Sequence, residues 1–366
     1  MTGMLYCSRM AVMEKRITYH ELTDRDNTLK LREVLKTLPP FCTEFFRAIS
    51  TTTSTSTRIQ YAYGVRIFFQ FLLATNPSLK DKQLTDITLD TLDHVTALDI
   101  EEYVDYLKAY QPADSDEYIT NGEKGIKRKL SALRTFFAYY FKHERLSSNP
   151  TLRVDMPKLH QKEIIRLEAD EVARLLDFIE SCGDSMSPHQ RAYYEKNKIR
   201  DLAMITLLLG TGVRVSECVG LDVEDVDFNT NAIRVVRKGG NEMYVYFGPE
   251  VEKALRDYLE YRKGITAQAG HEHALFYSAQ RKRINVKSVE NLVKKYASQV
   301  TTTKKITPHK LRSTYGTALY QETGDIYLVA DVLGHKDVNT TKRHYAAMDD
   351  RRRRSAASAV HLREEE

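Results

Sequence analysis

The sequence predicts a mainly α-helical chain of two domains: a helical bundle, then an α+β domain with one small antiparallel sheet. Three observations support this fold class. The 366 residues exceed one ordinary domain, because domains cluster near about 100 to 200 residues. Apolar residues recur at helical spacing through most of the chain. A single pair of β-branched and aromatic runs, 232–237 and 243–247, flanks a Gly-Gly turn and predicts a hairpin.

The first domain is predicted to span residues 39–146. The preceding residues 1–38 are charge-mixed and end at Pro39-Pro40, which predicts a leader segment. Apolar and aromatic residues at helical spacing predict helices over 58–75, 100–110 and 126–143. The last of these carries basic residues among aromatics, and the basic residues are candidates for DNA binding: Lys127, Arg128, Lys129 and Arg134. Aromatics such as Phe136 and Phe137 either assist that contact or, as is commoner at this density, form the core.

Residues 147–164 are predicted to be an extended linker, because they contain Pro150 and Pro157 and show weak periodicity. The second domain follows over 165–350. It is predicted to contain an amphipathic helix near 172–179, an inserted polar loop over 181–198 and a buried helix over 200–209. The hairpin comes next, and its turn includes Lys238. The chain would end in a tail, residues 351–366, that contains a short apolar stretch at 356–362.

Charge is concentrated in two stretches. The net charge is +5 and the pI about 8.8, but residues 123–163 hold ten Lys and Arg against four Asp and Glu, and residues 281–312 hold ten against one. Arg281, Lys282 and Arg283 begin the second stretch. Either stretch alone could be a solvated helix face. Two stretches on either side of an arginine motif instead predict a polyanion as partner.

Several classes of protein are disfavoured. The four cysteines are widely spaced and form no Cys-x-x-Cys pair, which indicates neither a disulfide framework nor a zinc site. The fragment His271-Glu-His273 lacks further ligands, so we expect no metal. No apolar run reaches the length of a bilayer span, and the amino terminus lacks a signal pattern. We therefore expect a cytoplasmic, nucleoid-associated protein.

Five residues form an ordered series that suits phosphodiester chemistry. Arg214 and Glu217 follow Gly210 and Gly212, where a buried helix ends, and the pair serves either a site or a structural salt bridge. Thr307-Pro308 predicts a helix start that places His309 and Arg312 one turn apart. Gly334 should end another helix and project His335 from a turn, and Tyr345 follows. Two guanidiniums can stabilise a phosphate, imidazoles can move protons, and a phenol can attack phosphorus.

Together these segments resemble the tyrosine recombinase (phage integrase) family over residues 165–350. Arg214 matches its Arg-x-x-Glu motif, His309 and Arg312 its His-x-x-Arg box, and His335 its Leu-Gly-His motif. The remaining positions that match the family are Lys238 as the β-turn lysine, Glu217 as the supporting acid and Tyr345 as the nucleophile. Ser313 stands where a second histidine is common, and Tyr345 follows His335 by ten residues where nine is usual, with His344 in that slot.

The resemblance extends to the first domain, which looks like the family's SAM-like core-binding domain, so that the two domains would clamp duplex DNA. The polar interval over 181–198 and Arg237-Lys-Gly-Gly are similar to single-recombinase Xer proteins of the XerS type. The implied reaction is transesterification without ATP, metal or other cofactor. Tyr345 would attack the scissile phosphate and form a 3'-phosphotyrosyl link while Lys238 protonates the leaving 5'-oxygen and His309 assists proton movement.

The resemblance also implies partners: duplex DNA with an inverted-repeat site, and a homotetramer that acts on two sites through a Holliday junction. Residues 351–366 could dock into a neighbouring protomer. A DNA translocase or an accessory directionality factor could assist. The favoured function is resolution of chromosome dimers at a dif-like site. The alternatives are an integrase or excisionase of a phage or other mobile element and, less favoured, a catalytically silent DNA-binding protein. A type IB topoisomerase shares most of the site, but the first domain favours recombination.

Overall fold

The computed structural model describes residues 17–112, 115–160, 164–185, 187–237, 240–335, 337, 338 and 341. Contacts between Cα atoms divide the chain into two compact units, residues 1–161 and residues 162–366. Lys238, His344, Tyr345 and the tail at 351–366 lie outside the described residues.

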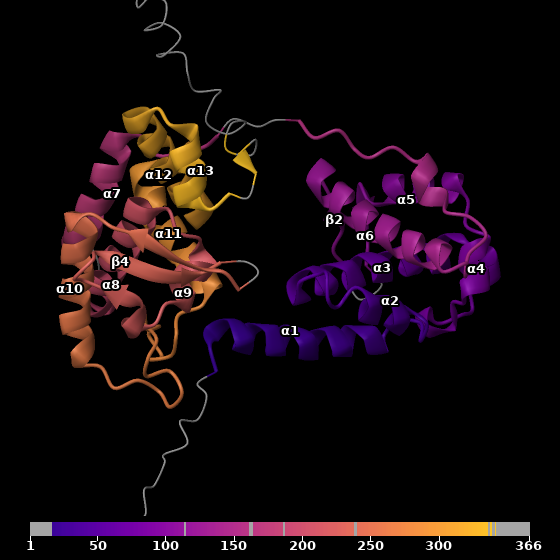
Figure 1. Ribbon diagram of the computed structural model, residues 1–366, viewed down its shortest axis with the longest axis horizontal. Coiled ribbons are helices and arrows are strands. Elements are labelled where there is room, and N and C mark those ends of the chain that lie inside the picture. Colours follow the sequence, from indigo (N-terminus) through magenta and orange to yellow (C-terminus); the bar gives the residue numbers. More distant parts are fainter. Residues whose placement is uncertain are drawn as a thin grey trace, which may run out of the picture. The chain divides into compact units, whose positions relative to one another are not determined.

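The first unit is a helical bundle (Figure 1). Its helices are α1 (Tyr19–Lys36), α2 (Cys42–Ala48), α3 (Thr55–Thr75), α4 (Leu89–Asp93), α5 (Ala97–Tyr106) and α6 (Glu123–Lys142). Short 3₁₀ turns are η1 (Pro77–Leu79), η2 (Leu84–Asp86) and η3 (Pro150–Arg153), and β1 (Ala109–Tyr110) pairs antiparallel with β2 (Ile119–Thr120). The three helices that the sequence predicts are present as α3, α5 and α6.

Helix α3 lies between α1 and α6 and carries much of the core (Figure 1). Phe68 and Phe69 of α3 are fully buried and pack edge-on against Phe137 and Phe136 of α6. Tyr103 of α5 packs on Phe68 in the same way. Burial of one such ring stabilises a fold by about 1.5 to 3 kcal/mol. Phe136 and Phe137 are therefore core residues, the commoner of the two roles that the sequence leaves open.

The expected leader does not stand apart from the bundle. Thr18 and Glu21 form a capping box that starts α1, and Leu31 and Val34 of this helix are buried in the same hydrophobic core as α3. Leu38, at 2% exposed, belongs to that core as well. The Pro39-Pro40 pair ends a helix, but the helix before it packs as part of the bundle.

Part of the stretch predicted as a linker contacts the first unit. Pro150 and Thr151 are buried in η3, and the Asn149 side chain accepts the Thr151 N–H at 3.2 Å. Val154 is 6% exposed and belongs to the first core. His160 is still held by Glu123 at the start of α6, with Nδ1 and Oε1 2.6 Å apart. Residues 147–160 thus pack against the first unit, because apolar side chains between Pro150 and Pro157 anchor them to its core.

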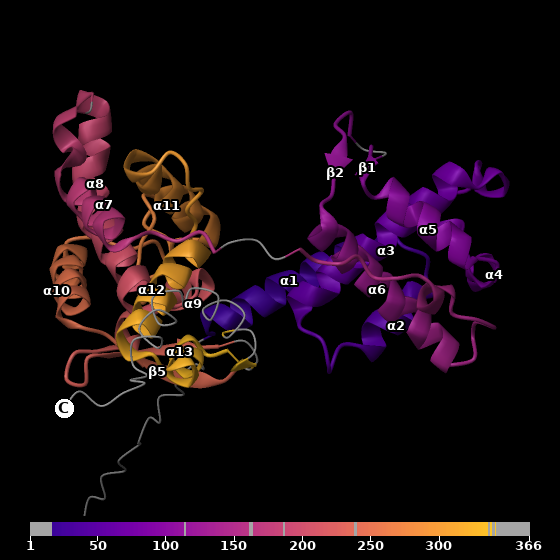
Figure 2. The same ribbon diagram turned by 90° about the horizontal axis from the view of Figure 1, so that it is seen from above.

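The second unit combines helices with a three-stranded sheet (Figure 2). Its helices are α7 (Ala169–Ser181), α8 (Pro188–Thr211), α9 (Val215–Gly220), α10 (Pro249–Lys263), α11 (Val286–Val300), α12 (Pro308–Thr323) and α13 (Ile326–Leu333), with 3₁₀ turns η4 (Cys182–Ser185) and η5 (Val223–Asp225). The strands β3 (Val226–Asp227), β4 (Ala232–Val236) and β5 (Glu242–Tyr246) form an antiparallel sheet in that order. The register pairs Ile233 with Val226 and Val245. The predicted hairpin is β4 and β5.

Helix α8 is the central element of this unit and packs against α7, α9, α10 and α12. Its buried half includes an ion pair, Arg200 with Asp201 at 2.6 Å. Tyr296 of α11 donates to Asp201 at 2.9 Å, and Arg200 donates to the Tyr277 carbonyl at 2.9 Å. These partners satisfy the buried charges, which would otherwise be strongly destabilising. No helix in the described ranges is long and apolar enough to cross a bilayer.

The predicted loop over 181–198 is mostly helix, so that prediction was wrong. Helix α8 begins at Pro188, because Ser187 and Gln190 form a capping box and proline suits the first turn. Tyr194 is 1% exposed, and its hydroxyl donates to the Ile179 carbonyl of α7 at 2.8 Å. Few apolar residues anchor this polar extension to the fold, so hydrophobic periodicity did not reveal it.

Candidate active site

Arg214 is positioned by a glycine turn. Helix α8 ends at Thr211, and Gly212 takes the left-handed conformation with φ of 63°. A Cβ at this position would lie 2.4 Å from the Tyr315 ring and 2.9 Å from Leu333. Glycine is therefore required both for the backbone angle and for close packing. The turn leaves Arg214 as the N-cap residue of α9.

Glu217 holds Arg214 in place. Its carboxylate accepts the Arg214 backbone N–H at 2.8 Å and Nη1 at 2.7 Å. The Glu217 side chain is 3% exposed, whereas the Arg214 side chain is 37% exposed. A buried carboxylate with one charged partner fixes that partner's geometry. The Glu217 carboxylate is therefore buried, and the Arg214 guanidinium that it orients is accessible to solvent.

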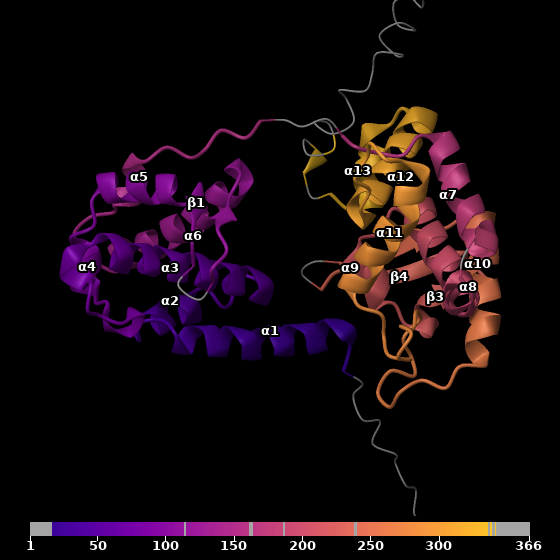
Figure 3. The same ribbon diagram turned by 180° about the vertical axis from the view of Figure 1, so that it is seen from behind.

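Arg312 comes from α12, which starts at the predicted Pro308 with Thr307 as N-cap. The residue is 4% exposed. Its Nη1 donates to the Gly212 carbonyl at 2.5 Å, and its Nη2 donates to the Leu333 carbonyl. Arg312 thus joins the Arg214 turn to the end of α13, which lies beside α12 (Figure 3).

His335 follows α13 as predicted. Gly334 is left-handed with φ of 61°, and the His335 N–H donates back to the Ala330 carbonyl at 2.9 Å, which closes the helix end. Nδ1 of His335 lies 2.7 Å from the hydroxyl of the buried Thr341. This contact leaves Nε2 as the ring nitrogen that points away from Thr341.

Three arginines from distant parts of the chain converge on the end of α13. Three consecutive carbonyls accept their guanidiniums: Val332 from Arg237 at 2.8 Å, Leu333 from Arg312, and Gly334 from Arg214 at 3.2 Å. The carbonyl end of a helix carries partial negative charge and attracts cations. The structure therefore brings Arg214, Arg312 and His335 together at one turn.

Of the other predicted catalytic residues, the structure describes only His309. His309 is exposed in the first turn of α12, one turn before Arg312. Lys238 and Tyr345 lie outside the described residues, although Arg237 and Gly240 on either side of the Lys238 turn are described. Arg237 is a residue of this site that we did not predict. In the sequence it is marked by its place between the hairpin strand and Lys238, at the start of the Arg237-Lys-Gly-Gly run.

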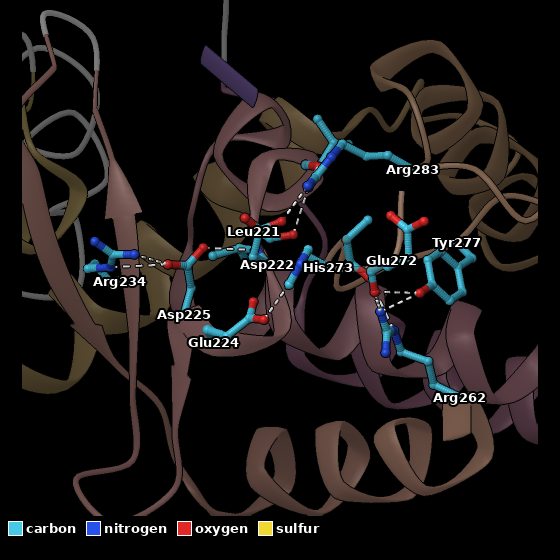
Figure 4. A network of polar contacts seen from close by, with 12 residues as sticks. Leu221, Asp222, Glu224, Asp225, Arg234, Arg262, Glu272, His273, Tyr277 and Arg283 are labelled. Carbon is cyan, nitrogen blue, oxygen red and sulfur yellow. Dashed lines mark hydrogen bonds and ion pairs between the residues drawn. The ribbon is translucent and has the colours of Figure 1, made fainter. Parts of the chain in front are cut away.

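A network of polar contacts surrounds the segment that follows α9 (Figure 4). Arg283 donates to the Leu221 carbonyl at 2.8 Å and pairs with Asp222, both just after α9. Within the same network Arg234 binds Asp225 at 2.7 Å, and His273 binds Glu224 at 2.5 Å. The Arg283 contacts hold the end of α9, whose beginning holds Arg214, and the other two contacts hold η5, which follows it.

The residues predicted to bind DNA differ in exposure and in the internal contacts that they make. Arg128, Arg281 and Lys282 are exposed, and Lys127 is half-buried. The other three make internal contacts: Lys129 with Asn121 at 2.6 Å, Arg134 with the Val154 carbonyl, and Arg283 with Asp222. Burial, followed by the charge of Arg128, lowers the pKa of Lys129. Exposed cations are the ones that can reach a phosphate backbone without breaking a contact.

The fragment His271-Glu-His273 does not gather metal ligands in the described ranges, where no group of three or more His, Cys, Asp or Glu residues is suited to hold a metal ion. His273 is held by Glu224, and Glu272 accepts the Gly270 N–H at 3.0 Å. Both His273 and Glu272 thus make contacts that stabilise the loop.

Comparison with known proteins assigns the family. The model of the phage integrase family matches residues 165–352. The tyrosine recombinase XerS of Lactococcus lactis subsp. cremoris (strain MG1363) is 32% identical over 337 residues, which cover 86% of this chain and 93% of that protein. The chain belongs to the phage integrase family. The tyrosine recombinase XerC of Caldanaerobacter subterraneus subsp. tengcongensis is likewise 32% identical over 356 residues, 94% of this chain and 92% of the relative.

The family fold agrees with the predicted fold class. The solved Tn1549 transposon integrase in complex with transposon right end DNA covers 87% of this chain and 99% of its own, with a TM-score of 0.62 and 19% identity. The sequence relatives make the chain a tyrosine recombinase. Its fold is mainly helical with a small antiparallel sheet, as predicted.

Proposed function

We propose that this tyrosine recombinase cuts and rejoins duplex DNA at an inverted-repeat site and resolves chromosome dimers at a dif-like sequence. The observation that carries the catalytic part is the convergence of Arg214, Arg312 and His335 on one turn. A phosphate at this turn would meet two guanidiniums and an imidazole. Each well-placed donor contributes about a hundred- to thousandfold in rate to a reaction that builds charge on oxygen.

In the proposed step, the Tyr345 oxygen forms a bond to phosphorus and the bond to the 5'-oxygen breaks. The phenol proton leaves with the help of His309, and the 5'-oxygen takes a proton from Lys238. The number of phosphoester bonds is unchanged, so the reverse attack by a 5'-hydroxyl can rejoin strands without an energy source. Exchange of partner strands between two sites then gives a Holliday junction.

Chromosome-dimer resolution is favoured over integration by the Xer names of the sequence relatives, each about a third identical over most of this chain. The alternative, an integrase or excisionase of a mobile element, is supported by the structural likeness to the Tn1549 integrase. The two functions share one chemistry and differ in the DNA site. Deletion of the gene separates them: dimer resolution predicts filamentous cells with unsegregated chromosomes, and integration predicts normal division.

A suicide substrate tests the chemistry. The wild-type protein is incubated with a nicked dif-like duplex, from which the cleaved segment diffuses away, and covalent protein–DNA complexes are resolved on a denaturing gel. A band with wild type and none with Tyr345→Phe supports the proposal. Bands from both proteins would place the nucleophile elsewhere. No band from wild type on any inverted-repeat site would favour a silent DNA-binding protein.

We further propose that the enzyme acts as a homotetramer and that residues 351–366 dock into a neighbouring protomer. The sequence supports this with an apolar stretch at 356–362 that follows four arginines. Deletion of 351–366 should abolish cooperative recombination and leave DNA binding intact in a mobility-shift assay. Unchanged recombination by the truncated protein would refute the docking.

A further inference from the structure

A cavity of about 310 Å³ lies between α8, α10 and the loop that connects α10 to α11. Its lining includes the exposed residues Lys196 of α8 and Arg281 of the loop, and also Arg200 of α8, which is 7% exposed. The three arginines that bind the end of α13 are not among the lining residues. We propose that this cavity binds a phosphate group separate from the one that the Arg214 turn would hold.

The cavity carries positive charge that the protein itself does not neutralise. Its described lining residues include no aspartate or glutamate. In the described part of the chain neither Lys196 nor Arg281 pairs with a carboxylate, whereas Lys198 on the same helix pairs with Glu195 at 2.9 Å. Unpaired cations at one cavity attract an anion, and an anion with several oxygens can accept hydrogen bonds from both side chains.

The backbone of Arg281 is unusual for an arginine. Its φ is 61°, in the left-handed region that glycine adopts most readily. Its N–H donates to the Ser278 carbonyl at 2.9 Å, and its carbonyl accepts the Gln268 N–H at 3.0 Å, so the turn is fixed. The turn by itself would be more stable with glycine. A charged side chain at this strained position therefore indicates a function for the side chain.

Hydrogen bonds hold the walls of the cavity in place before any ligand binds. The Tyr261 hydroxyl of α10 donates to the Lys196 carbonyl at 2.8 Å. Arg200 donates to the Tyr277 carbonyl of the loop at 2.9 Å, and its charge is balanced by Asp201. These bonds join α8 to both other walls of the cavity. A ligand would therefore bind with little reordering of the protein.

A phosphate group suits the lining side chains. Arginine presents a planar fork and lysine a compact charge, and both are common partners of phosphate oxygens. Ser278 and Thr266 add hydroxyl groups to the lining, and hydroxyls also donate to phosphate oxygens. The phosphate comes either from the backbone of duplex DNA or from a free phosphate compound. The two sources differ in the binding assay that detects them.

Binding of a DNA backbone phosphate is tested through the salt dependence of affinity. Each phosphate contact contributes about 0.9 to the slope of log affinity against log salt concentration. The double variant Lys196→Gln/Arg281→Gln, the cavity variant, should therefore have a slope smaller than that of wild type by about 0.9. The reduction should be the same for a dif-like and an unrelated duplex, because a phosphate contact carries no sequence information. Fluorescence anisotropy of a labelled duplex measures the affinities.

Lys198→Gln/Lys253→Gln is the matched control. It removes the same net charge from the protein, but Lys198 of α8 pairs with Glu195 at 2.9 Å and Lys253 of α10 pairs with Asp257 at 2.8 Å. Neither lysine is among the lining residues of the cavity. The slope of this control should equal that of wild type, because no phosphate contact is lost.

Binding of a free phosphate compound is tested by thermal unfolding at constant ionic strength, with inorganic phosphate and with dAMP. A ligand that binds only the native state raises Tm. If the cavity holds such a compound, it should raise the Tm of wild type and of the control but not that of the cavity variant.

Either result supports the inference and identifies the source of the phosphate. If the cavity variant matches the control in both assays, the cavity binds no phosphate and the inference is wrong. Neither assay involves strand cleavage, so that outcome leaves the proposed function standing. If wild type binds no duplex, the proposed function fails, and the thermal assay alone decides whether the cavity binds phosphate.

Discussion

The packing at the end of α13 makes Gly334 a sensitive position for stability. In Gly334→Ala, a left-handed alanine is disfavoured by about 1 to 2 kcal/mol. The new Cβ would overlap the Arg237 guanidinium and force it away from the Val332 carbonyl, a charged hydrogen bond worth about 1.5 to 3 kcal/mol. The expected loss in free energy of unfolding is therefore about 2.5 to 5 kcal/mol.

Gly270→Ala separates the two contributions. Gly270 has φ of 83°, and nothing lies within 4 Å of an added Cβ, so only the backbone penalty of about 1 to 2 kcal/mol applies. In an Arg237→Ala background, Gly334→Ala should fall to that same value. The coupling of about 1.5 to 3 kcal/mol corresponds to a difference in Tm of about 3 to 12 °C for a domain of this size.

The assay is thermal unfolding followed by circular dichroism at 222 nm, because the chain contains no tryptophan. All four variants of the cycle are compared under one buffer condition, and the coupling follows from the double-mutant difference. Equal losses for Gly334→Ala in the presence and absence of Arg237 would refute the proposed clash. So would a loss for Gly334→Ala no larger than that for Gly270→Ala.

Three more changes test other parts of the structure. Glu217→Gln removes the buried charge that holds Arg214 and should lower the free energy of unfolding by about 1.5 to 3 kcal/mol and slow covalent complex formation; unchanged values in denaturant titration and the gel assay would contradict this. Tyr194→Phe deletes the hydroxyl bond to Ile179 at 2.8 Å and should lower stability by about 1 kcal/mol, a loss that would vanish if residues 188–198 were a loop. Burial, then the Glu217 charge, raises the pKa of Cys218 to about 12, so the reactive thiolate forms only as pH rises toward that value; iodoacetamide at pH 8 should label Cys218 only in unfolded protein, and rapid labelling of native protein would refute its burial.

The sequence predicted those features that depend on local rules. Glycine turns at Gly212 and Gly334, the helix start at Pro308 and the β4–β5 hairpin each follow from a few adjacent residues, and each is found. The pairing of Arg214 with Glu217 also follows from spacing along the chain. Local conformational preferences are strong at such positions.

Features that depend on distant contacts were not predicted. Tyr194 fixes a polar helix through one buried ring and one hydroxyl bond, a signal too weak for periodicity to detect. Helix α1 joins the first core through Leu31 and Val34, although a proline pair follows it. Arg237 reaches Val332 across 95 residues of sequence, and no local pattern indicates such a contact. The roles of Arg283 and Lys129 likewise depend on partners that only the fold supplies.

The central claim is that Tyr345 is the residue that becomes covalently linked to DNA. The most direct measurement is to trap the complex on a suicide substrate, digest protein and DNA, and locate the remaining nucleotide by tandem mass spectrometry. We predict a 3'-phosphate ester on Tyr345 and an unmodified His344 in the same peptide. A nucleotide on another residue, or a 5'-phosphate linkage, would contradict the mechanism.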